Sequence, residues 1–215
     1  MMNRQLVFCA DLQARESVYK HNQDLKDDDL VALEQVVDFC NDPSVRCDAL
    51  ILGGDQVDSP RIGDEHVIQL RRILRGCKAP VYYINGNHER GFRRLELEGG
   101  SASVALSLEH HPFTFAGYTV TGCGWKPRRE WEQIQEHNIP TGDILILHGF
   151  ADQAIEQLGL SSAAASSGGL GDFDLNWFDG VCKLCLMGDI HQYMHFEGSK
   201  HATQFYYPGS MWMHR

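Results

Sequence analysis

The chain has 215 residues, of which 43% are hydrophobic and 22% charged, and a formal net charge of −10. This composition is typical of a globular protein that can bury one core, and it excludes a disordered or fibrous chain. The acidic balance argues against a protein that holds nucleic acid on a broad basic surface. No apolar run approaches the length of a bilayer span, and the first residues lack the basic and then apolar profile of a signal peptide. We therefore expect one domain over residues 1–215, no membrane segment and a cytoplasmic location.

The first half of the chain alternates short apolar runs with helical patterns. We expect strands at 6–10, 49–52 and 81–84, because each run is apolar without interruption. A helix is expected from Asp27 to the stop signal Asn41-Asp42-Pro43, and a second helix after Gly63-Asp64. Apolar residues recur at helical spacing in both segments, namely Leu30, Leu33, Val37 and Cys40 in the first and Val67, Leu70, Leu74 and Cys77 in the second.

The second half begins with an antiparallel pattern. Two aromatic and β-branched runs at 113–115 and 118–121 are joined by Ala116-Gly117, which predicts a hairpin. A polar helix over 127–137 follows, then strands at 144–147, 182–187 and 205–207. The small and polar residues at 161–171 have little to bury, which predicts a flexible loop.

The seven cysteines are odd in number and lie mostly in apolar segments, which predicts reduced, buried thiols rather than a disulfide framework. Cys182 and Cys185 form a C-x-x-C pair inside a strand-like run. Positions three apart on a strand are expected on opposite faces, so these two thiols should not share a metal. No second pair completes a zinc site. We expect both cysteines to pack in the core.

Five short motifs each follow an apolar run, at the point where a strand is expected to end. Because the carboxyl ends of strands in an α/β sheet share one edge, we expect these motifs to meet in one crevice. The gathered side chains are three Asp, one Asn, three His and one Gln, which is a ligand set for two divalent cations. The motifs are Asp11-Leu12-Gln13, Gly54-Asp55-Gln56-Val57-Asp58, Gly86-Asn87-His88-Glu89, His148-Gly149 and Gly188-Asp189-Ile190-His191.

The order of these motifs resembles that of the calcineurin-like metallophosphoesterases across nearly the whole chain. The resemblance implies an α/β fold, a metallophosphoesterase-type αββα sandwich of two mixed β-sheets flanked by helices. It also implies a metal-dependent phosphodiesterase in which a hydroxide that bridges two metals attacks phosphorus. Carried over onto this chain, it places Asp11, Gln13, Asp55 and His191 around one metal, and Asp55, Asn87, His148 and Asp189 around the other.

The same resemblance implies that His88 stays off the metals and faces the substrate. Its expected role is that of a general acid, which protonates the leaving oxygen. The ring would be oriented by Glu89 or by a backbone carbonyl. Asp58 is expected as a helix or turn cap rather than as a ligand.

Two positions depart from the family pattern. Gln13 stands where the family most often has His, and Asp189 replaces the first His of G-H-x-H. An amide oxygen is a harder ligand than imidazole, which shifts the preference from zinc toward manganese or magnesium. We therefore expect two divalent ions, Mn²⁺ first, with Mg²⁺, Fe²⁺ and Zn²⁺ as alternatives. The extra negative charge of Asp189 predicts a weaker attraction for anionic phosphate.

Within the family, the chain is most similar to the SbcD-type nuclease subunits of double-strand-break repair, particularly their phage-like versions. The similarity rests on Ala10-Asp11 with the charged segment through Tyr19, on Gly188-Asp189-Ile190-His191-Gln192 and on Tyr207-Pro208-Gly209-Ser210. It implies a DNA exo- or endonuclease, with DNA as substrate and an ATPase subunit as a candidate partner. Two alternatives stay open: a small-molecule or nucleotide phosphatase or phosphodiesterase of the same fold, favoured by the acidic charge, and a catalytically degenerate binding protein, suggested by the two departures.

Overall fold

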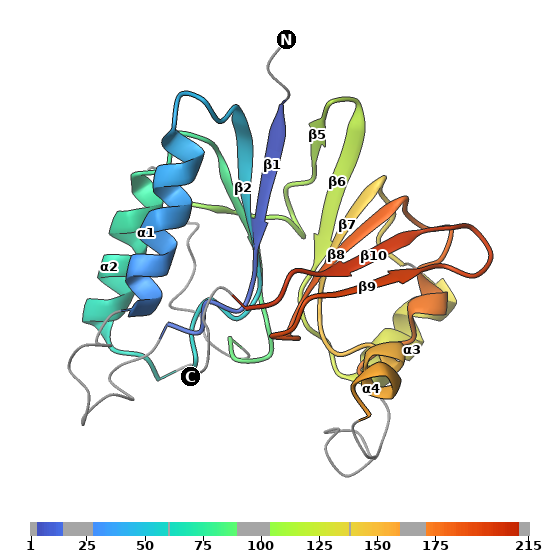
Figure 1. The fold of residues 1–215 in the computed structure, drawn as a ribbon. Helices are drawn as coiled ribbons and strands as arrows, with labels where there is room; N and C mark the ends of the chain where they lie inside the picture. The colour runs from blue at the N-terminus through green and yellow to red at the C-terminus, as the bar shows by residue number, and fades with distance from the viewer. Residues whose placement is uncertain are drawn as a thin grey trace.

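The computed structural model describes residues 4–14, 28–59, 61–89, 104–137, 139–159 and 171–210. Figure 1 shows two β-sheets packed face to face between two pairs of helices. α1 (Asp28–Asn41) and α2 (Asp64–Arg75) lie outside the first sheet, whereas α3 (Arg128–His137) and α4 (Asp152–Leu158) lie outside the second. The expected sandwich of two sheets flanked by helices is confirmed, but only the second sheet is mixed, because the described strands of the first are all parallel.

The first sheet contains parallel strands in the order β1-β2-β3-β4. In the register of the sheet, Cys9 pairs with Leu52 and Gly53 pairs with Ile84. The carboxyl ends of β1, β2 and β3 therefore align along one edge. The strands are β1 (Gln5–Cys9), β2 (Cys47–Gly53), β3 (Val81–Ile84) and β4 (Leu106–Ser107).

The second sheet is mixed, with the order β5-β6-β7-β8-β10-β9. Its central strands β6, β7, β8 and β10 are parallel, and the outer strands β5 and β9 are antiparallel to their neighbours. The predicted hairpin between β5 and β6 is confirmed, and its turn residues Ala116 and Gly117 both have positive φ. At the carboxyl edge, His148 of β7 pairs with Gly188 of β8. The strands are β5 (Phe113–Phe115), β6 (Tyr118–Cys123), β7 (Ile144–His148), β8 (Leu184–Gly188), β9 (Met194–Glu197) and β10 (Gln204–Tyr207).

Buried side chains form three hydrophobic clusters that correspond to the interfaces between layers. The first cluster includes Leu33 of α1 and Leu70 of α2 and lies against the first sheet. The second includes Trp131 of α3 and lies against the second sheet. The third joins the two sheets and contains Ile51 of β2 and Ile146 of β7. Strand β2 thus contacts a different apolar layer on each face, as expected for a near-continuous hydrophobic strand.

The predicted helices are found close to their expected positions. α1 buries Leu30, Leu33, Val37 and Cys40, and it ends at Asn41, where the stop signal begins. α2 ends at Arg75, so Cys77 lies in the turn after the helix rather than on its buried face. A 3₁₀ turn, η4 (Leu175–Trp177), precedes β8. Among the helices of the described segments, none has the length and apolar character needed to cross a bilayer.

Two further expectations about the second half concern the loop at 161–171 and the pair of Cys182 and Cys185. Residues 161–170 of the expected flexible loop lie outside the described residues, and Gly171 at its end donates a hydrogen bond from its N–H to Asp152 Oδ1 at 2.6 Å. The expectation that Cys182 and Cys185 lie on opposite strand faces is wrong. β8 begins only at Leu184, so strand alternation does not extend to Cys182, and both thiols lie in the same apolar cluster. Both are buried in the second cluster, so the predicted core packing is confirmed.

We expect Phe178→Ala to lower the free energy of unfolding by about 3–5 kcal/mol, the cost of deleting a buried aromatic side chain. The ring of Phe178 is fully buried and meets Trp131 and Phe173 edge to face, with centroid distances of 5.5 and 5.4 Å. Urea unfolding followed by circular dichroism measures the change. The matched control is Phe39→Ala, because Phe39 is 50% exposed and its loss should change stability by no more than about 0.5 kcal/mol. Equal losses in the two variants would contradict this account of the core.

Candidate metal centre

Both sheets contribute side chains to one edge of the sandwich. Asp11 and Asp55 follow β1 and β2, His148 ends β7, and Asp189 follows β8. Two direct contacts connect the edges: His148 Nδ1 lies 2.8 Å from the carbonyl oxygen of Gly53, and the Asp189 N–H donates to both oxygens of Asp11 at 2.9 and 3.1 Å. Residues up to 178 positions apart in the sequence therefore meet at one place.

Four of the predicted ligands form a compact cluster. Asp11, Asp55, His148 and Asp189 each offer one ligand atom, and these atoms all lie within 4.8 Å of one another. Nε2 of His148 is 3.4 Å from Oδ1 of Asp55 and 3.9 Å from Oδ1 of Asp189. Asp11, Asp55 and His148 are fully buried, and the Asp189 side chain is 17% exposed. Carboxylates buried this close together require compensating positive charge, so the donor set fits a divalent cation.

The backbone around the cluster has an unusual conformation. Asp11, Gln13, Asp55 and Asp189 all have positive φ, between 48° and 97°. Residues with side chains rarely adopt this region, and they keep it where surrounding contacts enforce it, most often at functional sites. Here the N–H of Asp11 donates to the carbonyl of Gly54 at 3.1 Å, and the N–H of Gln13 donates to the carbonyl of Asp55 at 2.8 Å. The turns after β1 and β2 therefore hold each other in the conformation that exposes their carboxylates to the cluster.

His148 is oriented by a hydrogen bond from the ring nitrogen that faces away from the carboxylates. The Gly53 carbonyl accepts a hydrogen bond from Nδ1, which leaves Nε2 directed at the carboxylates and able to bind a metal. The next residue, Gly54, has a φ of +96°, and a Cβ at this position would lie 2.2 Å from Nδ1 of His148. A side chain at position 54 would therefore displace the ring.

The amide of Asn87 lies against the cluster. One terminal atom of this amide lies 3.1 Å from both carboxylate oxygens of Asp55 and from Nε2 of His148. If this atom is nitrogen, it donates to Asp55. If it is oxygen, it lies against two carboxylate oxygens, an arrangement that is favourable only with a cation between them. Asn87 can thus serve the cluster as a donor without metal and as an oxygen ligand with metal.

The charges of the cluster shift the pKa of its members. Burial raises the pKa of Asp11 to about 6 and that of Asp189 to about 7, and in both cases the neighbouring Asp55 adds to the rise. Burial opposes the protonation of His148, but the Asp55 carboxylate outweighs it and raises the pKa to about 10. Burial likewise opposes ionisation of Asp55, but the His148 charge lowers the pKa of this carboxyl. Without metal, the cluster retains protons at neutral pH.

His88 lies beside the cluster. Its Nδ1 is 2.6 Å from the carbonyl oxygen of Asp58, and its Nε2 is 3.7 Å from Oδ2 of Asp55. Because the carbonyl can only accept, Nδ1 carries a proton and Nε2 faces the site. Burial alone would lower the pKa of His88, but the charge of Asp55 and the hydrogen bond to Asp58 raise it. Asp58, expected only as a cap, thus contributes through its backbone carbonyl.

Glu89 is buried and connects two of the loops that carry ligands. Its Oε2 accepts hydrogen bonds from the N–H groups of Asp55 at 2.9 Å and Gly86 at 2.6 Å, and its Oε1 accepts from Val57 at 2.9 Å. Burial raises the pKa of Glu89 to about 7, and the charge of Asp55 adds to the rise. These contacts support a positioning role through the backbone, whereas a direct role toward His88 stays a prediction.

The other two predicted ligands lie at the margin of the cluster. Nε2 of His191 is 3.9 Å from Oδ1 of Asp11, and the His191 side chain is 31% exposed. Gln13 is partly buried in the same turn as Asp11. Both positions are adjacent to Asp11, as the predicted first metal requires. The assignment of two metals with Asp55 as the bridge stays a prediction.

Residues outside the five motifs support the site. The Oη of Tyr207 donates to the carbonyl of Gly149 at 2.8 Å, which holds the chain just after His148. Asp172 accepts from the indole Nε1 of Trp125 at 3.1 Å. Tyr207 opens the Tyr207-Pro208-Gly209-Ser210 motif, so the sequence contained a signal for it. Asp172 stands outside every motif. Its hydrogen bond with Trp125 joins residues 47 positions apart in the sequence, so no local pattern indicates it.

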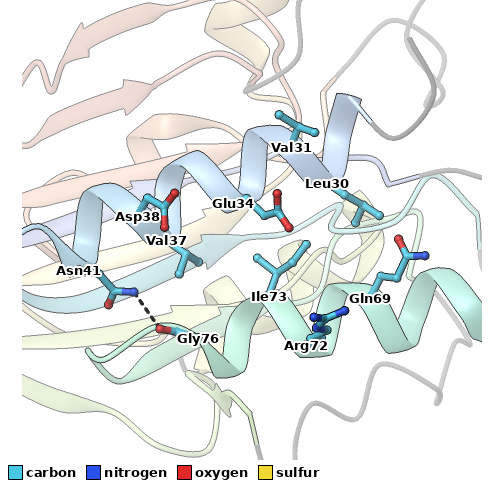
Figure 2. Close-up of a pocket in the computed structure, with 10 residues that line it drawn as sticks. All are labelled: Leu30, Val31, Glu34, Val37, Asp38, Asn41, Gln69, Arg72, Ile73 and Gly76. Carbon is cyan, nitrogen blue, oxygen red and sulfur yellow. Dashed lines mark hydrogen bonds between the residues drawn. The ribbon is translucent and has the colours of Figure 1, made fainter. Parts of the chain in front are cut away.

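The groove shown in Figure 2 lies elsewhere, between α1 and α2. It has a volume of about 520 Å³ and is lined by apolar residues such as Leu30, Val37 and Ile73 together with Glu34 and Arg72. None of its lining residues is a predicted ligand. The convergence of ionisable side chains, rather than the size of a cavity, therefore marks the candidate site.

Solved structures similar to this chain were found, and the first of those below supports the fold. One crystal structure aligns with 95% of this chain and 90% of its own length, with a TM-score of 0.54 and 13% identity. An archaeal phosphodiesterase aligns with 95% of this chain and 83% of its own, with a TM-score of 0.45 and 11% identity. A protein of unknown function from Aquifex aeolicus aligns with 88% of this chain and 81% of its own, with a TM-score of 0.39 and 13% identity.

The sequence comparisons identify the family. Among curated proteins no significant match is found. The family model of the calcineurin-like phosphoesterases, in contrast, matches residues 5–193, a span that includes all the predicted ligands. Because this match covers most of the chain and the cluster fits a divalent cation, the chain belongs to the calcineurin-like phosphoesterase family and is a metal-dependent phosphoesterase.

Proposed function

We propose that this phosphoesterase is a phosphodiesterase that uses two divalent metal ions to cut nucleic acid, as a DNA nuclease. The observation that carries the reaction class is the cluster of three carboxylates and one imidazole within 4.8 Å, with His88 beside it. The resemblance of the motifs to SbcD-type nucleases supports DNA as the substrate. The side chains of His88 and His191 are 32% and 31% exposed, so this edge of the site is open to solvent.

The metals would be held by oxygen and imidazole ligands. Carboxylate and amide oxygens with imidazole suit Mn²⁺, and Mg²⁺ or Fe²⁺ can occupy similar sets. When bound, the metals supply an activated water and neutralise negative charge on the phosphate. The proposed ligands are Asp11, Gln13, Asp55, Asn87, His148, Asp189 and His191.

The chain's own residues supply the proton for the leaving group. The carbonyl of Asp58 holds Nδ1 of His88, so the transferable proton is on Nε2. The raised pKa favours the protonated ring near neutral pH. As the bond between phosphorus and the leaving oxygen breaks, this proton moves from Nε2 to that oxygen.

A small phosphoester is the second candidate substrate. The formal net charge of −10 repels a polyanion over the whole surface, whereas a small ester meets only the local field of the site. The substrate class is therefore the part of the proposal that most needs an experiment.

One activity screen tests the proposal. Metal-stripped protein is reloaded with Mn²⁺, Mg²⁺, Fe²⁺ or Zn²⁺ and assayed on bis(p-nitrophenyl) phosphate, on p-nitrophenyl phosphate, and on single- and double-stranded DNA. We expect hydrolysis of the diester and of DNA, with Mn²⁺ most active, and loss of both activities in Asp55→Asn. Turnover of the monoester without any cleavage of DNA would favour the phosphatase. Failure to take up any divalent ion would favour a catalytically degenerate binding protein.

His88→Gln should reduce turnover by about 10²–10⁴-fold for a diester with a poor alkoxide leaving group. The loss should be much smaller for a p-nitrophenolate leaving group, which departs without a proton. Steady-state rates on the two diesters measure the difference, and His110→Gln, a change in an exposed loop, is the matched control. Equal losses on both diesters would show that His88 positions the substrate instead of donating a proton.

Metal binding should release protons, and the affinity should rise with pH. Without metal, the pKa of His148 is about 10 and that of Asp189 about 7, so a cation must displace protons from both at neutral pH. Calorimetric titration with Mn²⁺ in two buffers of different ionisation enthalpy counts these protons, and we expect more to be released near pH 6 than near pH 8. An affinity that does not change with pH would contradict the protonated cluster.

The same pKa shifts predict how the stability of the metal-free protein depends on pH. Its carboxyls Asp11 and Asp189 have raised pKa values, so the folded state retains protons that the unfolded chain has lost. Their contribution to stability is therefore lost as pH rises from about 4 to 7. Thermal melts of metal-free and Mn²⁺-loaded protein should show a stabilisation by metal that grows with pH over this range. A stabilisation by metal that stays constant between about pH 4 and pH 7 would contradict the predicted direction of this pH dependence.

A further inference from the structure

We propose that Cys40 and Cys77 form a redox-sensitive thiol pair, which hydroperoxides convert to a disulfide that joins the end of α1 to the turn after α2. The pair lies at the amino end of β2, whereas Asp55 follows the carboxyl end of this strand. The inference therefore does not depend on the phosphoesterase reaction.

The position of Cys40 relative to Cys77 is set by the residue that follows it. The side chain of Asn41 donates from Nδ2 to the Gly76 carbonyl at 2.8 Å and accepts from the Lys78 N–H at 2.8 Å. Figure 2 shows the first of these bonds at the end of the groove between α1 and α2. Asn41 thus binds the residues on both sides of Cys77. These bonds hold the end of α1 against the turn that contains Cys77, and they do not involve the side chain of either cysteine.

The three cysteines of this junction share one apolar cluster. Cys40 is 6% exposed and belongs to the core cluster beneath α1, and Cys47 and Cys77 pack against the same cluster. The neighbouring thiol of Cys77, burial and the neighbouring thiol of Cys47 together raise the pKa of Cys40, so all three thiols lie near one another. Of the seven cysteines, all of which the structure describes, Cys47 and Cys77 are partly exposed and the other five are buried. A small oxidant can therefore reach Cys47 or Cys77 directly, and Cys40 lies next to both.

Cys77 is the better nucleophile of the two exposed thiols. The hydrogen bond from Cys40, together with one from the Ala79 N–H, lowers the pKa of Cys77 to about 7 against the effect of burial. Burial raises the pKa of Cys47. Because the thiolate is the reactive form, peroxide should attack at Cys77 first.

The reaction balances with one hydroperoxide for two thiols. The Cys77 thiolate attacks a peroxide oxygen, the O–O bond breaks, and Cys77 becomes a sulfenic acid as hydroxide or alkoxide leaves. The sulfur of Cys40 then attacks the sulfur of Cys77. The S–O bond breaks, and the oxygen leaves as water with the proton of Cys40. Two thiols are oxidised, and the peroxide is reduced.

A metal site is a weaker interpretation of the same cysteines. Three thiolates that share one ion must all approach one another closely. Cys40 lies near both neighbours, but the metal-compatible group found among the described residues is the Asp and His cluster, not these three thiols. A pairwise bond centred on Cys40 therefore fits the arrangement better than a shared ion.

Peptide mapping after peroxide treatment tests the proposal. The full chain is treated with hydrogen peroxide under native conditions, alkylated, digested without reduction and analysed by mass spectrometry. We expect a Cys40–Cys77 cross-linked peptide to be the main cysteine oxidation product. In Cys77→Ser, the loss of the free thiol at Cys40 should slow at least tenfold, because Cys40 is buried and depends on Cys77 for activation. In Cys40→Ala, Cys77 should accumulate as a sulfenic acid that dimedone traps.

Control variants distinguish oxidation of Cys40 and Cys77 from nonspecific oxidation of other cysteines. Cys47→Ser should retain the cross-link, and Cys185→Ala, a change at a buried cysteine of β8, should leave its rate unchanged. A dominant Cys40–Cys47 link, or equal loss of Cys40 in wild type and in Cys77→Ser, would overturn the proposal. Mapping of the wild type decides the question even if a variant fails to fold. Manganese uptake by the oxidised wild type should equal that of the reduced protein, because the pair lies at the opposite end of β2.

Discussion

The close approach of buried carboxylates is the constraint on which the site depends. Asp11 and Asp55 are inaccessible to solvent, and Asp189 lies within reach of both. Each negative charge disfavours ionisation of the others, because little water screens them. In the metal-free protein, His148 and retained protons provide the compensation. A divalent cation supplies more positive charge at the same position, so the arrangement that destabilises the empty cluster is the one that favours metal.

The contacts that bring the buried carboxylates together are also contacts between the elements of the fold. The bonds from His148 to Gly53 and from Asp189 to Asp11 connect the second sheet to the first. Glu89 connects the turns after β2 and β3 within the first sheet. β2 also contributes Ile51 to the apolar layer between the sheets. Packing of the two sheets therefore brings the carboxylates together, and the hydrogen bonds at the edge hold them there against their repulsion.

Much of this arrangement could be predicted from short patterns. The apolar runs before Asp11, Asp55 and His148 indicated strands, and the shared edge of an α/β sheet indicated that the motifs meet. A backbone carbonyl was among the expected partners of His88, but which residue supplies such a backbone atom could not be predicted, because every residue has a carbonyl and nearly every residue has an N–H. The Asp58 carbonyl beside His88 is such a partner. The proximity of Cys40 to Cys77 likewise follows from packing of α1 against α2, which no local pattern encodes.

The acidic composition does not decide the chemistry of the site, because charge acts at two length scales. Three carboxylates and the proposed bridging hydroxide contribute four negative charges, which two divalent cations would balance, so a loaded cluster would not repel phosphate locally even in a chain of net charge −10. Charges farther than about 8–10 Å away are largely screened at moderate ionic strength. They act mainly on a substrate long enough to cross the wider surface. Reactivity toward phosphorus is thus a property of the cluster, whereas the choice between a polymer and a small ester is a property of the surface around it.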